Sequence, residues 1–113
     1  MNEKVQLICR TLSDKKASDI KIVKIKGISD IADYFVICSG KSAPQVKAIY
    51  DHLDFVMSEA GIEPKRHEGI SEGKWIAIDY EDVLVHIFYS ETREFYQLDK
   101  LWANGTNVTD YTD

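Results

Sequence analysis

The stretch that decides the fold reads Trp75-Ile-Ala-Ile-Asp-Tyr80, then Glu81-Asp82, then Val83-Leu-Val-His-Ile-Phe-Tyr89. Two runs rich in β-branched and aromatic residues are separated by two turn residues, and this pattern predicts a β-hairpin. The Glu-Asp turn is a weaker signal than Asn-Gly, which readily takes positive φ. A two-residue turn sets the register, with facing positions Tyr80 and Val83, Ile78 and Val85, and Ile76 and Ile87. Almost all of these side chains are β-branched or aromatic, so we expect this face to pack on a core.

The opposite face of the hairpin mixes large aromatic side chains with one carboxylate and one imidazole. Its members are Trp75, Ala77, Asp79, Leu84, His86 and Phe88. A solvated strand face is usually more polar than this, and a core face usually lacks an Asp and a His. Two interpretations stay open: a working surface, or a second core face whose two polar groups are satisfied.

The composition fits one small globular domain. The chain has 113 residues, of which 44% are apolar and 29% charged, and this length suits a single core. Its net charge of −5, from 19 acidic and 14 basic residues, argues against a broad, non-specific grip on a nucleic-acid backbone. The same charge suits a basic protein partner, because opposite charge speeds encounter. Direct RNA binding by Lys21, Lys24 and Lys26 is an alternative, although alternation along a strand explains these lysines as well.

We expect a cytoplasmic protein that does not enter a membrane. No long apolar region follows Met-Asn-Glu-Lys at the start, so no signal peptide is predicted. No run approaches the ~20 apolar residues that a membrane span needs. Cys9 and Cys38 lie inside apolar runs, where buried free thiols are the usual outcome. Both observations fit a reducing compartment.

The remaining elements follow from hydrophobic periodicity and cap residues. We expect a helix over residues 2–16, a strand over 20–25 and a central, doubly covered strand over 34–38. The alternation in the first strand slips between Ile22 and Val23, which suggests a bulge or a change of burial. A second helix over 42–60 follows, and then a polar segment with a short strand over 62–74.

After the hairpin, Ser90 is expected to cap a short final helix. Phe95, Leu98, Leu101 and Trp102 repeat at helical spacing, which is typical of core packing. Residues 104–113 carry no periodicity and are expected to form a loose C-terminal tail behind a domain that spans residues 1–103. The order of elements predicts a single α/β domain with a mixed β-sheet packed with helices.

The corner Ser39-Gly40-Lys41-Ser42 raises the question of nucleotide binding. A helix N-terminus that carries Gly and Lys can hold an anion. The full phosphate loop is GxxxxGK[ST], however, and only its last three residues occur here. Ser42 and Gln45 form a capping-box pattern that explains the corner without a ligand.

No other pattern makes a positive case for an enzyme. His52, His67, His86, Cys9 and Cys38 are scattered along the chain, so we expect no metal site and no cofactor. Asp79 and His86 are near neighbours across the hairpin, and they can hydrogen-bond without catalysis. Nothing like GxSxG supports a Ser-His-Asp arrangement.

Three blocks of the sequence carry a resemblance to a known family. They are Asp30-Ile-Ala-Asp-Tyr-Phe-Val-Ile-Cys-Ser-Gly-Lys-Ser42, Trp75-Ile-Ala-Ile-Asp-Tyr-Glu-Asp-Val-Leu-Val-His-Ile-Phe88 and Arg93-Glu-Phe-Tyr-Gln-Leu-Asp-Lys-Leu-Trp102. In this order and spacing they resemble the Iojap family, the bacterial ribosomal silencing factors, over residues 3–103. The Tyr-Glu-Asp turn departs mildly from the Tyr-Gly-Asp of the family.

The resemblance implies a non-enzymatic translation factor. Members of this family bind the large ribosomal subunit through large-subunit ribosomal protein fourteen, block joining of the small subunit and lower translation when nutrients are short. Their fold is similar to the nucleotidyltransferase α/β fold, but no DxD or DxE strand follows the Ser39-Gly40 corner, so that similarity does not imply activity. A nucleotidyltransferase-like, nucleotide-binding enzyme is the alternative. The resemblance and the edge strands also suggest a homodimer.

We expect an acidic domain to approach a basic ribosomal protein by charge and to hold it with aromatic anchors. The predicted partner-binding residues are Glu68, Trp75, Asp79, Tyr80, His86, Arg93 and Tyr96. Trp75 is the expected anchor, while Glu68 and Asp79 are expected to meet Lys or Arg of the partner. Core packing is the alternative for Trp75; for Tyr96 and Arg93 the alternatives are helix packing and a solvated charge.

Overall fold

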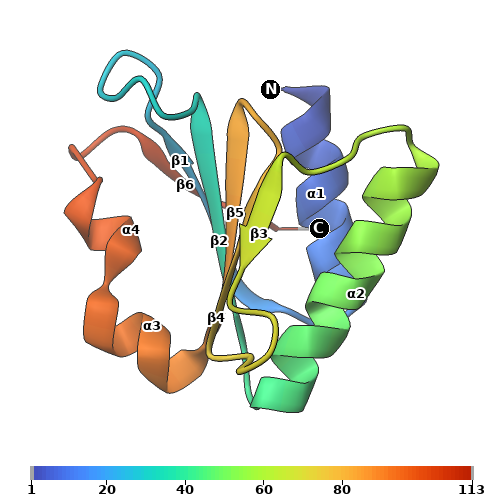
Figure 1. Cartoon of the computed structure of the whole chain (residues 1–113). Helices are drawn as coiled ribbons and strands as arrows, with labels where there is room; N and C mark the ends of the chain where they lie inside the picture. The colour runs from blue at the N-terminus through green and yellow to red at the C-terminus, as the bar shows by residue number, and fades with distance from the viewer. Residues whose placement is uncertain (1, 113) are drawn as a thin grey trace.

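A six-stranded mixed sheet forms the centre of the molecule, with its strands in the order β3-β4-β5-β2-β1-β6 (Figure 1). The computed structural model describes residues 2–112. β2 and β5 are parallel, and the other neighbouring pairs are antiparallel. The strands are β1 (Ser18–Lys24), β2 (Tyr34–Gly40), β3 (Arg66–Glu68), β4 (Trp75–Asp79), β5 (Val83–Tyr89) and β6 (Val108–Asp110). The prediction of a single α/β domain with a mixed sheet is confirmed.

The two faces of the sheet are covered unequally. The long helices α1 (Glu3–Asp14) and α2 (Ala43–Glu59) lie together on one face, and the short helices α3 (Ser90–Tyr96) and α4 (Leu98–Leu101) lie on the other (Figure 1). The apolar stripes of α1 and α2 form the larger core with the sheet, for example Ile8 and Leu53, which are fully buried. A smaller core around Phe35 and Phe88 lies under Trp102 and Leu98.

The predicted hairpin register is confirmed. Ile78 pairs with Val85 and Ile76 with Ile87, and the Tyr80 amide donates to the Val83 carbonyl at 3.0 Å. Isoleucine and valine at these positions are buried in the larger core, as their face predicts. The turn residue Glu81 takes a φ of 78°, a left-handed conformation that favours glycine. The Asp79 carboxylate accepts from the Glu81 amide at 2.8 Å and holds the turn in place.

Both predicted long helices and the central strand are confirmed. Asn2 caps α1, and Ser42 caps α2 by accepting from the Gln45 amide. The Gln45 side chain reaches back to the Lys41 amide at 2.6 Å, which completes a variant of the predicted capping box. β2 lies between β5 and β1, and its apolar run is buried from Phe35 onward because both faces of the sheet are covered there.

The irregularity in β1 lies earlier than the alternation suggested. The register shifts between Ser18 and Lys21, where Asp19 has a φ of 51°. Ile22 and Val23 are both buried, because the sheet has a core on each side of them. The slip in alternation therefore reflects a change of burial, and the bulge is a separate feature.

Two predictions for the C-terminal helical region are wrong. Ser90 does not cap the final helix, since its hydroxyl donates to the Gly40 carbonyl at 3.0 Å instead. Gln97, with a φ of 50°, breaks the expected helix into α3 and α4. The break turns Phe95 and Leu101 outward, where they are 80% and 74% exposed, so they are not core residues. Leu98 and Trp102 do pack on the smaller core.

The expected loose tail at residues 104–113 is also wrong for its described part. Residues 108–110 form β6, which pairs with β1 at the edge of the sheet. The Asn107 side chain donates to the carbonyls of Lys24 and Trp102, and Lys21 forms an ion pair with Asp110. The contacts with β1 are long-range in sequence, which is why periodicity within the segment did not reveal the strand. The domain therefore extends beyond residue 103.

Replacing Glu81 by glycine is expected to raise the free energy of unfolding by about 1 kcal/mol, because glycine takes φ of 78° without the cost of a side chain. The Lys65–Glu81 pair that is lost is exposed, with a separation of 3.8 Å, and contributes little. Chemical denaturation measures the change. The control is Glu72→Gly, another exposed turn residue that lacks positive φ, where glycine is expected to lower stability. Equal effects at both positions would contradict the conformational explanation.

Candidate functional site

The second face of the hairpin is neither all core nor all surface. Phe88 is fully buried and His86 is 9% exposed, whereas Trp75, Ala77, Asp79 and Leu84 are half-buried. Phe88 belongs to the smaller core, and Trp75 and Leu84 pack against that core, whereas Ala77 and Asp79 lie opposite β3. The second-core interpretation holds for Phe88 and His86, and the half-buried part of this face stays the candidate working surface.

A hollow of about 450 Å³ lies over this half-buried part of the sheet, and we call it the hairpin hollow. Its walls include Ile31, Arg66, Glu68, Asp79, Leu84 and His86. Ile31 comes from the loop before β2, while the others come from β3, β4 and β5. The floor is apolar and the rim is charged, an arrangement typical of a surface that binds protein.

Trp75 connects the buried and exposed parts of the face. Its indole N–H donates to Nδ1 of His86 at 3.0 Å. Its ring lies 4.7 Å from that of Phe88 and 4.9 Å from that of Tyr96, measured between centroids. Tyr96 is 53% exposed, so the aromatic cluster continues from the sheet to the surface of α3. These contacts hold Trp75 in one orientation.

His86 is held neutral by burial. Nδ1 accepts from Trp75, so Nε2 carries the proton in the neutral ring. Burial lowers the pKa of His86 to about 4. Its neighbours are aromatic rings, including that of Phe35, whose centroid lies 5.1 Å from the centroid of the imidazole. These rings offer no charged group to pair with an imidazolium. Nε2 has no hydrogen-bond partner among residues 2–112. The hydrogen bond that the hairpin register allows between His86 and Asp79 is not formed; His86 accepts from Trp75 and Asp79 from the Glu81 amide.

The charged rim of the hairpin hollow contains two acidic residues and one arginine. Arg66 and Asp79 face each other across β3 and β4, with Nε of Arg66 3.5 Å from Oδ2 of Asp79. Glu68 lies two residues further along β3 and is exposed. Glu68, Trp75, Asp79 and His86 all lie on this face of the sheet, and Tyr96 reaches it through its ring contact with Trp75.

Tyr80 and Arg93 do not belong to this surface. Tyr80 is 2% exposed and packs in the larger core on the opposite side of the sheet, where burial raises the pKa of its hydroxyl. Its own predicted position opposite Val83 explains this, because that face is the core face. Arg93 is 6% exposed, so its side chain is neither a solvated charge nor a contact on the surface.

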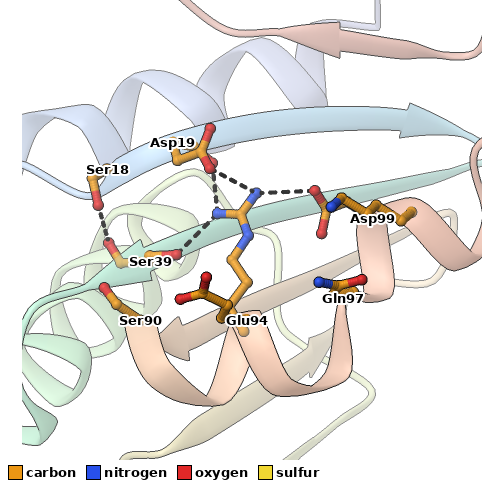
Figure 2. A pocket seen from close by; sticks show the side chains of 9 residues that line it. Ser18, Asp19, Ser39, Ser90, Glu94, Gln97 and Asp99 are labelled. Atoms are coloured by element: carbon orange, nitrogen blue, oxygen red, sulfur yellow. Dashed lines mark hydrogen bonds and ion pairs between the residues drawn. The ribbon is translucent and has the colours of Figure 1, made fainter.

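Arg93 lies in a second, polar pocket of about 380 Å³ between α3 and the ends of β1 and β2 (Figure 2). Its Nη1 donates to the Asp19 carbonyl at 2.7 Å and to the Ser39 hydroxyl at 3.0 Å. Its Nη2 lies 3.6 Å from the Asp19 carboxylate and 3.7 Å from that of Asp99. Figure 2 shows Asp19, Ser39 and Asp99 pointing toward the same part of this pocket. Arg93 therefore joins α3 and α4 to the sheet.

The groups of the Ser39-Gly40-Lys41-Ser42 corner have structural roles in the folded chain. The Ser39 hydroxyl accepts from Arg93, and the Ser42 hydroxyl caps α2. A Cβ at Gly40 would lie 2.9 Å from Cγ2 of Val46, so close packing of helix on strand accounts for this glycine. These contacts explain the corner without a phosphate ligand.

No group of three or more His, Cys, Asp or Glu side chains within residues 2–112 is arranged to hold a metal ion. Cys9 and Cys38 are both buried free thiols, as expected, and burial raises the pKa of each to about 12. None of the helices in the described chain has the length and apolarity to cross a membrane.

Sequence reasoning missed two kinds of surface residue. Arg66 on β3 and Ile31 in the loop before β2 line the hairpin hollow, yet neither stands out by pattern. Phe95 and Leu101 are exposed, although their spacing suggested burial. A helix-breaking signal at Gln97 would have revealed this, but glutamine is not a residue that favours left-handed backbone.

Comparison with known proteins adds a consistent set of relatives. The sequence model of a family described as "Ribosomal silencing factor during starvation" matches residues 1–113. The chain is 45% identical over 106 residues to the ribosomal silencing factor RsfS of Halalkalibacterium halodurans, which covers 94% of this chain and 91% of that protein. It is 41% identical over 107 residues to RsfS of Bacillus subtilis, with 93% and 91% covered. A crystal structure of a protein from Bacillus halodurans is similar, with a TM-score of 0.81, 45% identity and 88% and 93% of the chains covered.

The buried neutral His86 predicts a loss of stability in weak acid. Its pKa is about 4 in the folded chain and near 6.5 when unfolded, so below pH 6.5 the unfolded state binds a proton that the folded state does not. The free energy of unfolding should fall by about 2 kcal/mol between pH 7 and pH 5 from this residue. Denaturation of the wild type and of His86→Phe at both pH values isolates the effect, because other groups titrate in both. An equal fall in the two proteins would contradict it.

Proposed function

The chain belongs to the ribosomal silencing factor family, and on this premise we propose that it binds the large ribosomal subunit through large-subunit ribosomal protein fourteen. Bound there, it sterically blocks joining of the small subunit and represses translation, especially when nutrients are limited. The observation that carries the proposal is the hairpin hollow with its apolar floor and charged rim, next to the positioned indole of Trp75, which donates to His86 in the lining.

Charge and aromatic content support a basic protein as the partner. The chain carries a net charge of −5, and Glu68 and Asp79 add local negative charge to the rim of the hollow. Trp75 and Tyr96 present ring area that is already packed, so little side-chain freedom is lost on binding. Tryptophan, tyrosine and arginine are the residue types that most often dominate binding energy at protein interfaces. Glu68, Trp75, Asp79, His86 and Tyr96 form the proposed partner-binding surface.

Tyr80 and Arg93 support this surface without being part of it. Tyr80 packs the opposite face of the hairpin against the larger core, and Arg93 fixes the helices that carry Tyr96. Substitutions at these two positions are expected to act on binding through the fold.

We propose a steric, non-enzymatic mode of action in the cytoplasm, with no cofactor, metal or specific nucleic acid. The alternative, a nucleotide-binding enzyme similar to nucleotidyltransferases, rests on the fold resemblance and the Ser39-Gly40 corner. Calorimetry with nucleoside triphosphates and magnesium distinguishes the two: saturable heat supports the alternative, and its absence supports the steric mode.

A homodimer is a further proposal within the family resemblance. β3 is an edge strand of three exposed residues, and β6 is the other edge. Both edges offer unpaired backbone groups to a second copy, and their shortness and charge limit pairing with other proteins. Light scattering across a concentration series is the direct test of the dimer.

Excess protein is expected to reduce formation of the full ribosome from mixed subunits, because one occupied surface on the large subunit cannot also receive the small subunit. Sucrose-gradient sedimentation measures this directly. Undiminished subunit joining under saturating protein would refute the proposal.

Trp75→Ala is expected to weaken binding to the purified ribosomal protein by about 10- to 100-fold, as for a central aromatic anchor. The matched control is Phe55→Ala, an aromatic that is 63% exposed on α2, on the opposite side of the sheet. Its affinity should match the wild type. Comparable losses for the two variants would place the contact elsewhere.

A further inference from the structure

Arg66 is in an unusual place for an acidic binding surface. It lies on the rim of the hairpin hollow, and it is the one permanently positive side chain among the described residues that line it. Its guanidinium reaches Asp79, the carboxylate on the neighbouring strand, at 3.5 Å. Asp79 is well covered, with 19% of its side chain exposed, whereas the Arg66 side chain is 76% exposed. The fixed carboxylate thus carries a loosely held internal counterion.

The Asp79 carboxylate is prepared for a stronger cation. One oxygen, Oδ1, accepts from the Glu81 amide at 2.8 Å, which fixes the group at the hairpin turn. The other oxygen, Oδ2, is the one that faces Arg66. At 3.5 Å this contact is longer than the two-pronged hydrogen-bonded pair that an arginine can form with a carboxylate. Oδ2 therefore stays available to an incoming side chain that approaches from the hollow.

The rest of the hollow suits the stem and head of a long basic side chain. Leu84 and Ile31 supply apolar walls for methylene groups, and Glu68 adds a second carboxylate on β3. His86 is neutral, so the buried ring below does not repel a cation. The volume of about 450 Å³ is ample for one side chain.

We propose that Arg66 occupies the place of a basic side chain of the partner, and that an arginine or lysine of the bound protein displaces it from Asp79. Arg66 then competes with the partner's basic side chain for Asp79. This competition weakens binding of the partner and keeps the hollow from binding other cations. The inference rests on the proposed function, since it describes how the same surface receives a basic protein. It identifies Asp79 as the acceptor and Arg66 as the group that must move.

The distinguishing consequence is that removing a charged residue from the binding surface improves binding. An exposed ion pair between flexible side chains is weak, and its loss corresponds to about 1.5- to 5-fold in affinity. Arg66→Ala is therefore expected to bind large-subunit ribosomal protein fourteen about 3-fold more tightly than the wild type. Asp79→Asn, which keeps an oxygen for the Glu81 amide, is expected to bind at least 10-fold more weakly.

Lys65→Ala is the matched control. Lys65 is the neighbouring residue and carries the same charge, but its partner is Glu81, 3.8 Å away at the turn and outside the lining of the hollow. Its removal changes the net charge by the same amount, so it measures the general electrostatic gain. Isothermal titration of the wild type and of Arg66→Ala, Asp79→Asn and Lys65→Ala at two salt concentrations separates this general gain from the gain that comes from freeing Asp79.

A clearly greater gain for Arg66→Ala than for Lys65→Ala supports the inference. Equal affinities of these two variants, or weaker binding of Arg66→Ala, would overturn it while leaving the proposed function intact. Unfolding of the variants is checked by circular dichroism, and Arg66→Gln provides a second, longer neutral side chain at the same site.

A small probe keeps the inference testable if the ribosomal protein does not bind at all. N-acetyl-arginine amide carries the proposed guanidinium without any ribosomal context. In Arg66→Ala, titration of this probe should shift the amide signals of Asp79 and Leu84 and the indole signal of Trp75 in nitrogen-correlated NMR spectra, with smaller shifts in the wild type. Absence of these shifts in Arg66→Ala would overturn the inference independently of the proposed function.

Discussion

The fold depends on burying one face of the β4–β5 hairpin completely while the other face stays half covered. The isoleucines and valines of the core face are closed off by α1 and α2, and burial of such side chains is the main favourable term in folding. Once that face is fixed, strand geometry directs Trp75, Asp79 and His86 to the other side. The proposed binding surface is thus positioned by the core and does not need a flexible loop to position it.

Arg93 determines how far the second face is covered. Its guanidinium joins α3 to the Asp19 carbonyl, the Ser39 hydroxyl and the Asp99 carboxylate. The two short helices are thereby held beside the smaller core, and β3 and the adjoining half of β4 stay open on that side. A buried charge that lost one of these partners would be costly, so this polar cluster fixes the position of Tyr96 against Trp75. The tether and the aromatic cluster together produce a preorganised surface.

Much of this could be predicted from the sequence, because strong local patterns encode it. The hairpin register follows from alternating apolar residues and a two-residue turn, and α2 follows from its apolar stripe and the Ser42 cap. The features that escaped prediction depend on contacts between distant segments. β6 is held by Asn107 and by Lys21, and the break at Gln97 arises where α4 turns to place Trp102 on the smaller core. The predicted site contained Tyr80, although its own strand position already assigned it to the core face, and it lacked Arg66, which only pairing of β3 with β4 brings to Asp79.

The central claim is that the half-buried Trp75 face receives the ribosomal protein. The direct test uses this chain labelled with 5-fluorotryptophan in a Trp102→Phe background, so that the fluorine signal reports on Trp75 alone. A soluble paramagnetic agent is added to the free protein and to its complex with large-subunit ribosomal protein fourteen. The account predicts broadening of the signal in the free protein and protection in the complex. Equal broadening in a complex shown to be saturated would contradict it.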